Sequence, residues 1–328
     1  MVQVGLIGAG RIGKVHAIAI GANPKAQLKY VSDVYAPAAE ELAKNYGAEV
    51  ASVDRIMDDP AIDLVMICSS TETHADLIER SARAGKAIFC EKPIDLDIKR
   101  VESVLNVVDE TGAKLMVGFN RRFDPNFMSL KKRLDAGEAG EVELVTIASR
   151  DPGAPPVEYI KGSGGLFRDM TIHDFDMARW LLGEEPSRIY ASAATLTDPE
   201  IGKVGDVDTA IVTLTCPSGR MAVITNSRRA SYGYDQRIEV HGSKGMLAAG
   251  NVLENTVAFS SETGTEVAKP LHFFLERYAQ AYQNELTTLI EALSTGGTVA
   301  PGGADGLRSL ELANAAFESL KSGAAVAV

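Results

Sequence analysis

Apolar and polar positions divide the chain into two parts with different periodicity. Up to about residue 120, short apolar runs alternate with longer stretches that carry apolar residues on one helical face. Short buried strands that alternate with amphipathic helices are typical of a parallel sheet covered on both faces. The runs predicted as strands are residues 2–7, 28–32, 63–68, 87–90 and 114–118, and the predicted helices are residues 14–20, 75–84 and 98–111.

Beyond about residue 120, the pattern changes to segments in which apolar and polar residues alternate with a period of two. Such alternation predicts the strands of a mostly antiparallel sheet. The predicted strands are residues 143–149, 187–194, 207–215, 220–226, 236–241 and 256–260, and the predicted helices are residues 169–182, 273–294 and 306–322. We therefore expect a doubly wound α/β domain over residues 1–120 and an α+β domain with a large open sheet over residues 121–328.

The second sheet is expected to be covered on both faces. In residues 207–215, one face carries Val, Thr and Ile and the other carries Asp, Ala, Val and Leu, so neither face is strongly charged as a solvated face would be. Too few helices remain in this part of the chain to cover both faces. We therefore expect one face to be a subunit interface of a homo-oligomer, which we predict to be a tetramer.

The first predicted strand runs directly into a glycine-rich turn, Gly8-Ala9-Gly10-Arg11-Ile12-Gly13. A GxGxxG match alone is weak, because glycine-rich turns are common. Here it follows a buried strand and opens a helix, whose N-terminal amides can receive phosphate. The context predicts a Rossmann-type dinucleotide site with contacts from Gly8, Gly10, Arg11, Ile12 and Gly13.

Asp33 ends the second predicted strand, about twenty residues after the last glycine, where such folds place an acid on the ribose 2′-hydroxyl. A carboxylate accepts hydrogen bonds from a diol but repels a 2′-phosphate. Residues 34–39 contain no Lys or Arg to bind that phosphate. We therefore predict NAD rather than NADP, with a solvated turn acid as the alternative interpretation of Asp33.

Charge and apolar runs exclude several classes of protein. The formal net charge is −11 and no basic stripe is present, which argues against a nucleic-acid surface. No apolar run approaches the roughly twenty residues that span a bilayer, and no signal peptide precedes the first strand, so a cytoplasmic protein is expected. Cys68, Cys90 and Cys216 lack CxxC spacing and lie in or at the end of strands, so we expect buried thiols and no metal.

Ligands of doubly wound sheets bind at the carboxyl ends of the strands. Three segments follow predicted strand ends in the first domain: residues 69–74, 91–93 and 119–122. Lys92 lies in the second of them, between Glu91 and Pro93. A lysine at this edge can hold a substrate hydroxyl and favour a developing alkoxide, whereas taken alone it would be assigned to the surface.

In the second domain, Gly164 and Gly165 precede a predicted helix that carries Asp169 and His173. Residues four apart share a helix face. Histidine can take a hydroxyl proton at neutral pH, and a neighbouring carboxylate can orient it and stabilise its charged form. A helix N-terminal acid and a core histidine are the alternative, and Asp176 is either a second orienting group or structural.

The order of these motifs, GAGRIG, Asp33, a strand-end EKP and then GG-x3-D-x3-H, resembles the Gfo/Idh/MocA family of NAD(P)-dependent oxidoreductases over essentially the full chain. Within that family the chain is most similar to the inositol 2-dehydrogenases. The similarity includes residues 118–124, 232–237 and 240–245.

The resemblance implies a catalytic group in which His173 is the acid/base, Asp169 assists it and Lys92 binds the reacting hydroxyl. It also implies a cis bond before Pro93. The implied nucleotide contacts are Ser69, Ser70, Thr71, His74, Glu91 and Lys92, and the implied substrate contacts are Asn120, Arg121, Asp151, Tyr232 and Tyr234.

We therefore predict an NAD-dependent dehydrogenase that oxidises a ring secondary alcohol of a polyol, with myo-inositol as the predicted substrate and 2-keto-myo-inositol as the product. The same chemistry on scyllo-inositol or an aldose such as glucose is the first alternative, because one fold and catalytic group serve several substrates. A NAD-binding sensor without turnover is the second alternative.

Overall fold

The computed structural model describes residues 1–328 and contains two compact units. Unit 1 comprises Met1–Phe123 and Gln280–Leu310, and unit 2 comprises Asp124–Ala279 and Glu311–Val328. The predicted boundary at residue 120 lies close to the first of these divisions. Residues 280–310, which we expected in the second domain, instead group with the first unit.

Unit 1 is built on a six-stranded parallel sheet with the order β3-β2-β1-β4-β5-β6, which confirms the predicted doubly wound domain. Its strands are β1 (Val2–Ile7), β2 (Ala26–Ser32), β3 (Glu49–Val50), β4 (Leu64–Ile67), β5 (Ala87–Cys90) and β6 (Leu115–Val117). The central strand β4 reads LVMI and is buried at every residue, as expected for a strand covered on both faces. The order reverses between β1 and β4, where ligands of such sheets bind.

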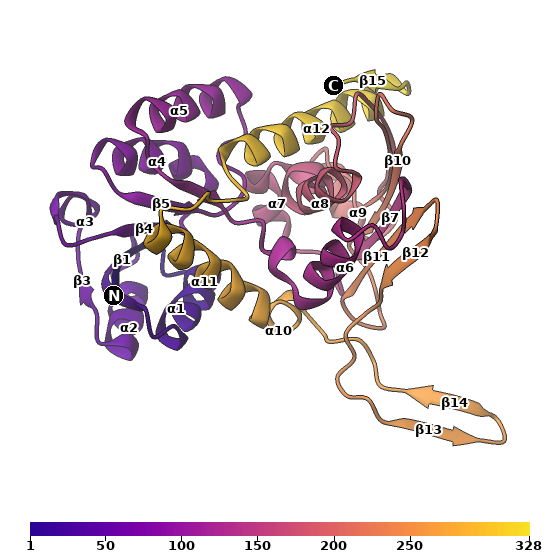
Figure 1. The fold of residues 1–328 in the computed structure, drawn as a ribbon, viewed down its shortest axis with the longest axis horizontal. Coiled ribbons are helices and arrows are strands. Elements are labelled where there is room, and N and C mark those ends of the chain that lie inside the picture. The colour runs from indigo at the N-terminus through magenta and orange to yellow at the C-terminus, as the bar shows by residue number, and fades with distance from the viewer. The chain divides into compact units, whose positions relative to one another are not determined.

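Five helices connect these strands (Figure 1): α1 (Arg11–Ala22), α2 (Ala36–Tyr46), α3 (Val53–Asp58), α4 (His74–Arg83) and α5 (Ile98–Thr111). Helix α5 shows how the sequence sets their ends. The Asp97 side chain accepts from the Lys99 amide at its start, and Gly112 ends it with a left-handed φ of 66°.

Helix α11 (Ala279–Thr295) packs into unit 1, which explains why residues 280–310 group there. The Tyr282 ring lies edge-on to the ring of His16 from α1, with centroids 5.4 Å apart. The Asn23 side chain donates to the Thr287 hydroxyl at 3.1 Å. The sequence pattern groups residues 280–310 with the segments next to them in the chain, whereas these contacts place the residues in the first unit.

Unit 2 contains a seven-stranded sheet with the order β12-β11-β7-β10-β9-β8-β15. Its strands are β7 (Val142–Arg150), β8 (Arg188–Ala194), β9 (Thr209–Thr215), β10 (Met221–Ser227), β11 (Asp235–Gly242), β12 (Gly245–Ala249) and β15 (Val326–Ala327). Every neighbouring pair is antiparallel except β7 and β10, which confirms the mostly antiparallel sheet. Because β7 and β10 are parallel, the residues after both strands meet at one edge.

One expected strand of this sheet lies elsewhere. Residues 256–260 were predicted as part of the large sheet, but the structure places β13 (Ala258–Ser261) in a separate hairpin with β14 (Gly264–Val267). Both strands are exposed along their whole length. The segment has no buried alternate positions to pack on the sheet, and Phe259 is 64% exposed.

The remaining helices are α6 (Pro125–Asp135), α7 (Val157–Ser163), α8 (Ile172–Leu182), α9 (Pro199–Lys203), α10 (Phe274–Arg277) and α12 (Gly303–Ser322). Helix α8 packs against β7 and β10, and the Ser319 hydroxyl of α12 accepts from the Ala191 amide of β8. Figure 1 shows both helices on one side of the sheet. No helix combines the length and apolar character needed to cross a membrane.

The other face of the sheet in unit 2 is not covered within the chain. Tyr190, Ile211, Met221 and Met246 are each at least 42% exposed on it. This exposed face is the one that the sequence predicts as a subunit interface.

Candidate active site

The turn between β1 and α1 is shaped by two glycines. Gly8 has a φ of 101°, and a Cβ there would lie 2.5 Å from the Cys68 backbone. A Cβ on Gly13 would lie 1.9 Å from the Gly8 oxygen. Both positions therefore accept only glycine, because Gly8 lies against the backbone that follows β4 and Gly13 lies against Gly8 itself.

The surface of this turn is open for a phosphate. Gly10 is exposed, and a Cβ there would have no atom within 4 Å. No side chain caps the N-terminus of α1, and no acidic residue lies in its first turn. Arg11 and Ile12 begin the helix, so its first amides remain available to an anion as the glycine pattern predicts.

Asp33 closes this site from the end of β2. Its Oδ2 accepts from the Ala9 amide at 2.6 Å, and its Oδ1 accepts from the Tyr35 amide at 2.7 Å. The carboxylate is thus fixed against the glycine turn rather than free in solvent. This position fits a ribose diol bound beside the turn.

The loop after β4 is held by its own side chains and by His74. The hydroxyls of Ser69 and Thr73 lie 2.6 Å apart, and Ser70 and Thr71 form the start of the following turn. The His74 Nδ1 lies 2.7 Å from the Pro93 oxygen, and Nε2 lies 3.1 Å from the Ser69 oxygen. The His74 ring is buried and joins two loops, so it supports the loop that carries the predicted nucleotide contacts.

Glu91 also points into unit 1. Its Oε1 lies 2.7 Å from the Nε2 of His16, and a Cβ on Gly118 would lie 3.0 Å from its other oxygen. Lys92 follows it, half-buried, and the Lys92-Pro93 bond is cis, as the resemblance implied. The loop therefore places the lysine at the carboxyl edge of the parallel sheet and anchors the glutamate beneath it.

A second acid, close to Glu91, was missed in the sequence. Glu285 on α11 is fully buried, and neither of its carboxyl oxygens has a hydrogen-bond partner. Burial, and then the nearby Glu91, raise the pKa of Glu285 well above its ordinary value. Its position in the sequence could have indicated the burial, since Glu285 has helical spacing to the buried Ala281, Tyr282 and Leu289 and lies on the same helix face.

Glu285 predicts a pH dependence of stability. In the folded chain Glu285 keeps its proton, whereas in the unfolded chain it releases the proton above about pH 4.3. The contribution of this group to the free energy of unfolding therefore falls by about 1.4 kcal/mol per pH unit as pH rises. We expect Glu285→Gln to remove this slope above about pH 5. Denaturant unfolding at several pH values measures it, with Glu291→Gln, exposed on the same helix, as the control. Parallel curves for wild type and Glu285→Gln would contradict the assignment.

In unit 2, a glycine pair prepares the predicted catalytic helix. Gly164 and Gly165 have φ values of 83° and 80°, and the Leu166 amide donates to both oxygens of Asp206 at 3.1 Å. A Cβ on Gly165 would lie 2.6 Å from Asp206 Oδ1. Residues Phe167–Thr171 then form a π-helical turn, which is common at functional sites, before α8 begins at Ile172.

Asp169 lies in this π-helical turn, and both of its oxygens are held. The Tyr159 hydroxyl donates to Oδ1 at 2.9 Å, and Arg228 donates to Oδ2 at 3.1 Å. Neither partner was predicted from the sequence. The neighbouring Arg168 points elsewhere, because its Nε donates to Asn314 at 2.7 Å.

His173 is half-buried in the first turn of α8, at the position predicted for the acid/base. Two buried acids follow it on the helix. Asp174 accepts from the Asn226 amide group at 2.8 Å, and Asp176 lies 3.9 Å from Arg179. Both alternatives for Asp176, a second orienting group or a structural acid, are compatible with this burial.

The predicted substrate residues fall into different environments. Asp151 lies 3.9 Å from Arg228. The Tyr232 hydroxyl donates to Asp235 at 2.6 Å, and the Tyr234 ring packs edge-on against two aromatic rings in the core of unit 2. Asn120 and Arg121 are buried in unit 1. Lys92 also belongs to unit 1, whereas Asp169 and His173 belong to unit 2.

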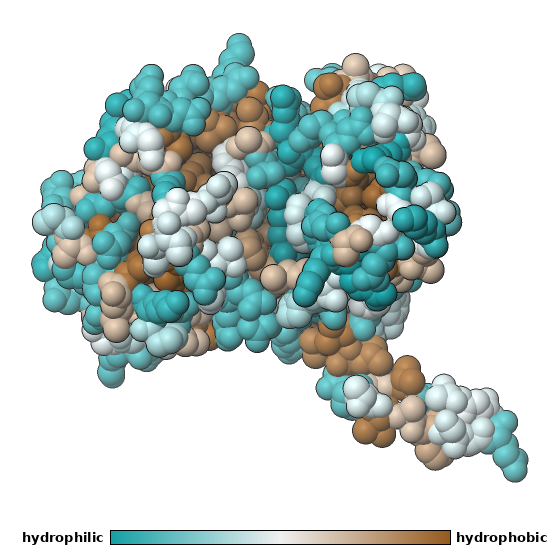
Figure 2. Space-filling model, viewed as in Figure 1, coloured by the Kyte–Doolittle hydropathy of each residue, from teal (hydrophilic) through white to brown (hydrophobic).

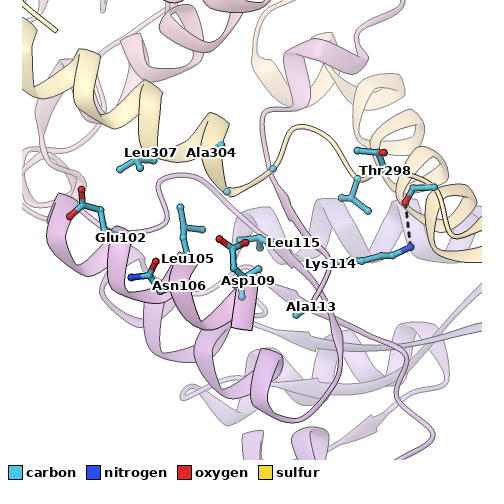
Figure 3. Close-up of a pocket in the computed structure, with 15 residues that line it drawn as sticks. Glu102, Leu105, Asn106, Asp109, Ala113, Lys114, Leu115, Thr298, Ala304 and Leu307 are labelled. Carbon is cyan, nitrogen blue, oxygen red and sulfur yellow. Dashed lines mark hydrogen bonds between the residues drawn. The ribbon is translucent and has the colours of Figure 1, made fainter. Parts of the chain in front are cut away.

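A hollow elsewhere in unit 1 is separate from these residues. A cavity of about 560 Å³ lies between α5 and the segment that leads into α12. Figure 3 shows the residues that line it. The Lys114 ammonium closes one end by donating to the Gly297 oxygen at 3.3 Å. Its lining contains none of the predicted site residues, so it is not the candidate active site.

Comparison with known proteins agrees with this geometry. Residues 2–119 match the oxidoreductase family with an NAD-binding Rossmann fold, and residues 127–248 match the GFO/IDH/MocA C-terminal domain. The chain is also 59% identical to an inositol 2-dehydrogenase of Rhizobium meliloti over 97% of both chains. The chain belongs to the Gfo/Idh/MocA family. As a Gfo/Idh/MocA protein it is a NAD-binding oxidoreductase, and the glycine turn and Asp33 of unit 1 fit that cofactor.

Solved Gfo/Idh/MocA structures are similar over the whole chain. A myo-inositol dehydrogenase from Corynebacterium glutamicum has a TM-score of 0.96 and 45% identity, covering 100% of this chain and 99% of that one. A scyllo-inositol dehydrogenase from Lactobacillus casei, with bound NAD(H) and scyllo-inositol, has a TM-score of 0.92 and 31% identity, covering 100% of this chain and 99% of that one.

Proposed function

We propose that the protein is an inositol 2-dehydrogenase, which oxidises myo-inositol with NAD+ to 2-keto-myo-inositol, NADH and a proton. The 59% identity to the Rhizobium meliloti inositol 2-dehydrogenase over 97% of both chains carries this proposal. The site chemistry supports it, because oxidation of a secondary alcohol needs a proton acceptor and a group that holds the hydroxyl. The cofactor supplies the hydride acceptor.

Three side chains divide this work in the proposed mechanism. Lys92 donates to the reacting hydroxyl oxygen and stabilises negative charge that develops on it. His173 accepts the hydroxyl proton at a ring nitrogen. Asp169, held on both oxygens by Tyr159 and Arg228, stabilises the charged imidazole. Asp151, Tyr232, Tyr234, Asn120 and Arg121 are proposed to bind the other hydroxyls.

The function is tested by following absorbance at 340 nm during incubation with NAD+ and each of several cyclitols. We expect turnover with myo-inositol. A preference for scyllo-inositol would support the second candidate, which the likeness to the Lactobacillus casei scyllo-inositol dehydrogenase favours. NAD+ binding without turnover on any cyclitol or aldose would favour the sensor without catalysis.

We infer that the exposed face of the sheet in unit 2 joins copies of the chain in a homotetramer. Its central strands carry Ile211, Thr213 and Val223 with no charged residue among them, and Ile211 is 54% exposed. The β13–β14 hairpin adds exposed Val257, Phe259 and Val267, and Figure 2 shows the apolar surface at its base. Apolar area of this kind marks interaction surfaces.

Light scattering at micromolar concentration tests the assembly. We expect a mass about four times the 34.9 kDa of one chain. Ile211→Arg should lower the mass, because a charge would be buried without a partner. Val50→Arg, at an exposed apolar site on the edge of the other sheet, should not. A wild-type mass of one chain would contradict the tetramer.

A further inference from the structure

Arg228 is a buried cation of unit 2 that contacts Asp169 of the proposed catalytic group. It follows β10 directly and is only 2% exposed. Because β7 and β10 are parallel neighbours, Arg228 and Asp151 emerge at the same edge of the sheet. The Asp151 amide donates to the Ser227 oxygen at 2.9 Å, which ties the two strand ends together.

The guanidinium reaches two carboxylates from this edge. One terminal nitrogen donates to Asp169 Oδ2 at 3.1 Å, and the other lies 3.9 Å from Asp151 Oδ2. Its Nε has no hydrogen-bond partner. The terminal nitrogens of Arg228 thus face two carboxylates, while its buried Nε is left without a hydrogen bond.

The charges around Asp169 show what this contact does. Two other acids, Asp206 and Asp151, contribute negative charge from other segments of the chain. Neither neighbour of Asp169 offsets this charge, because Arg168 donates to Asn314 and Tyr159 carries an uncharged hydroxyl. Burial raises the pKa of Asp206, and Arg228 opposes this rise while Asp169 adds to it. Arg228 therefore places a positive charge against Asp169 and Asp151, and it opposes the rise in the pKa of Asp206.

We propose that Arg228 is a positioning residue for the oxidation, which holds Asp169 ionised and oriented so that Asp169 can stabilise the charged form of His173. Arg228 fixes Oδ2 and Tyr159 fixes Oδ1, so the carboxylate can neither rotate nor take a proton without losing a contact. The inference rests on the proposed function, because it assigns a role within the same catalytic group.

The first test is the pH profile of Arg228→Gln in the full-length enzyme. Without the positive charge the pKa of Asp169 rises, so we expect kcat to fall about tenfold or more near pH 6 and clearly less near pH 9. The KM for NAD+ should stay within about twofold. Arg229→Gln is the matched control, because Arg229 is the exposed neighbour that donates to the Leu196 oxygen at 2.6 Å.

A double-mutant cycle separates an effect through Asp169 from direct contact with substrate. In an Asp169→Asn background the carboxylate is already gone, so Arg228→Gln should cost little more. Losses that multiply in the double variant would overturn the proposal. So would a folded Arg228→Gln enzyme with the wild-type pH profile.

Arg228→Lys keeps the test decisive if Arg228→Gln does not fold. An ammonium retains the charge but not the planar fork that reaches both carboxylates. We expect about a threefold or larger loss of kcat at pH 6, and wild-type kcat there would overturn the proposal. Wild-type enzyme without turnover on any cyclitol would defeat the proposed function instead, so the two failures are distinguishable.

Discussion

Replacement of His173 by Ala should lower kcat for inositol oxidation by about a hundredfold or more, because the hydroxyl proton then has no acceptor. Lys92→Ala should produce a loss of similar size, because the developing charge on the hydroxyl oxygen loses its donor. The affinity for NAD+ should remain largely intact in both. Steady-state kinetics and NAD+ titration of each purified variant measure these effects.

The pH dependence gives this prediction a second readout. The wild-type rate should rise with pH through one ionisation as His173 loses its proton, and that limb should disappear or move in His173→Ala. His272→Ala and Lys99→Ala, both at exposed positions, are the controls. Near-normal turnover in a His173→Ala enzyme with a native circular dichroism spectrum would assign the histidine to the core.

Asp33 should give the enzyme at least about a hundredfold preference for NAD+ over NADP+ in kcat/KM, a difference of roughly 2.7 kcal/mol. The carboxylate is fixed by the Ala9 and Tyr35 amides, so it cannot swing away from a 2′-phosphate. Asp33→Ser should narrow the preference by removing the repulsion. Kinetics with both cofactors at saturating inositol provide the measurement.

Asp63, a carboxylate at the amino-terminal end of the strands of the same sheet, provides the control for a general loss of structure. Asp63 precedes β4 and accepts from the Gln3 amide at 2.8 Å, so Asp63→Asn removes a comparable contact far from the carboxyl ends of the strands. It should leave the cofactor ratio unchanged. Equal efficiency of wild-type enzyme with NAD+ and NADP+ would contradict the role given to Asp33.

The features predicted well from the sequence are those with a local physical cause. The strand at residues 2–7 and the helix at residues 98–111 have the predicted bounds, because apolar runs and helix caps act over a few residues. The glycine turn was predictable for the same reason, since Gly8 and Gly13 lie against groups that a side chain would displace.

The features that were missed depend on contacts between segments distant in sequence. Arg228 and Tyr159 hold Asp169 from 59 and 10 residues away, and Glu285 approaches Glu91 from a helix that sequence order assigned to the other domain. No local periodicity reports such pairings, because they depend on how β7, β10 and α11 are packed.

The π-helical turn at Phe167–Thr171 makes the geometry at the start of α8 depend on the number of residues in the turn. Such a turn holds one residue more than the α-helical path would, as if a residue had been inserted. Deleting Met170 would allow a regular helix, but it would shorten the spacing between Asp169 and His173 from four residues to three. The two side chains would stay on one face of the helix, but they would meet at a different angle, so a more regular helix would change the alignment of the two proposed catalytic groups.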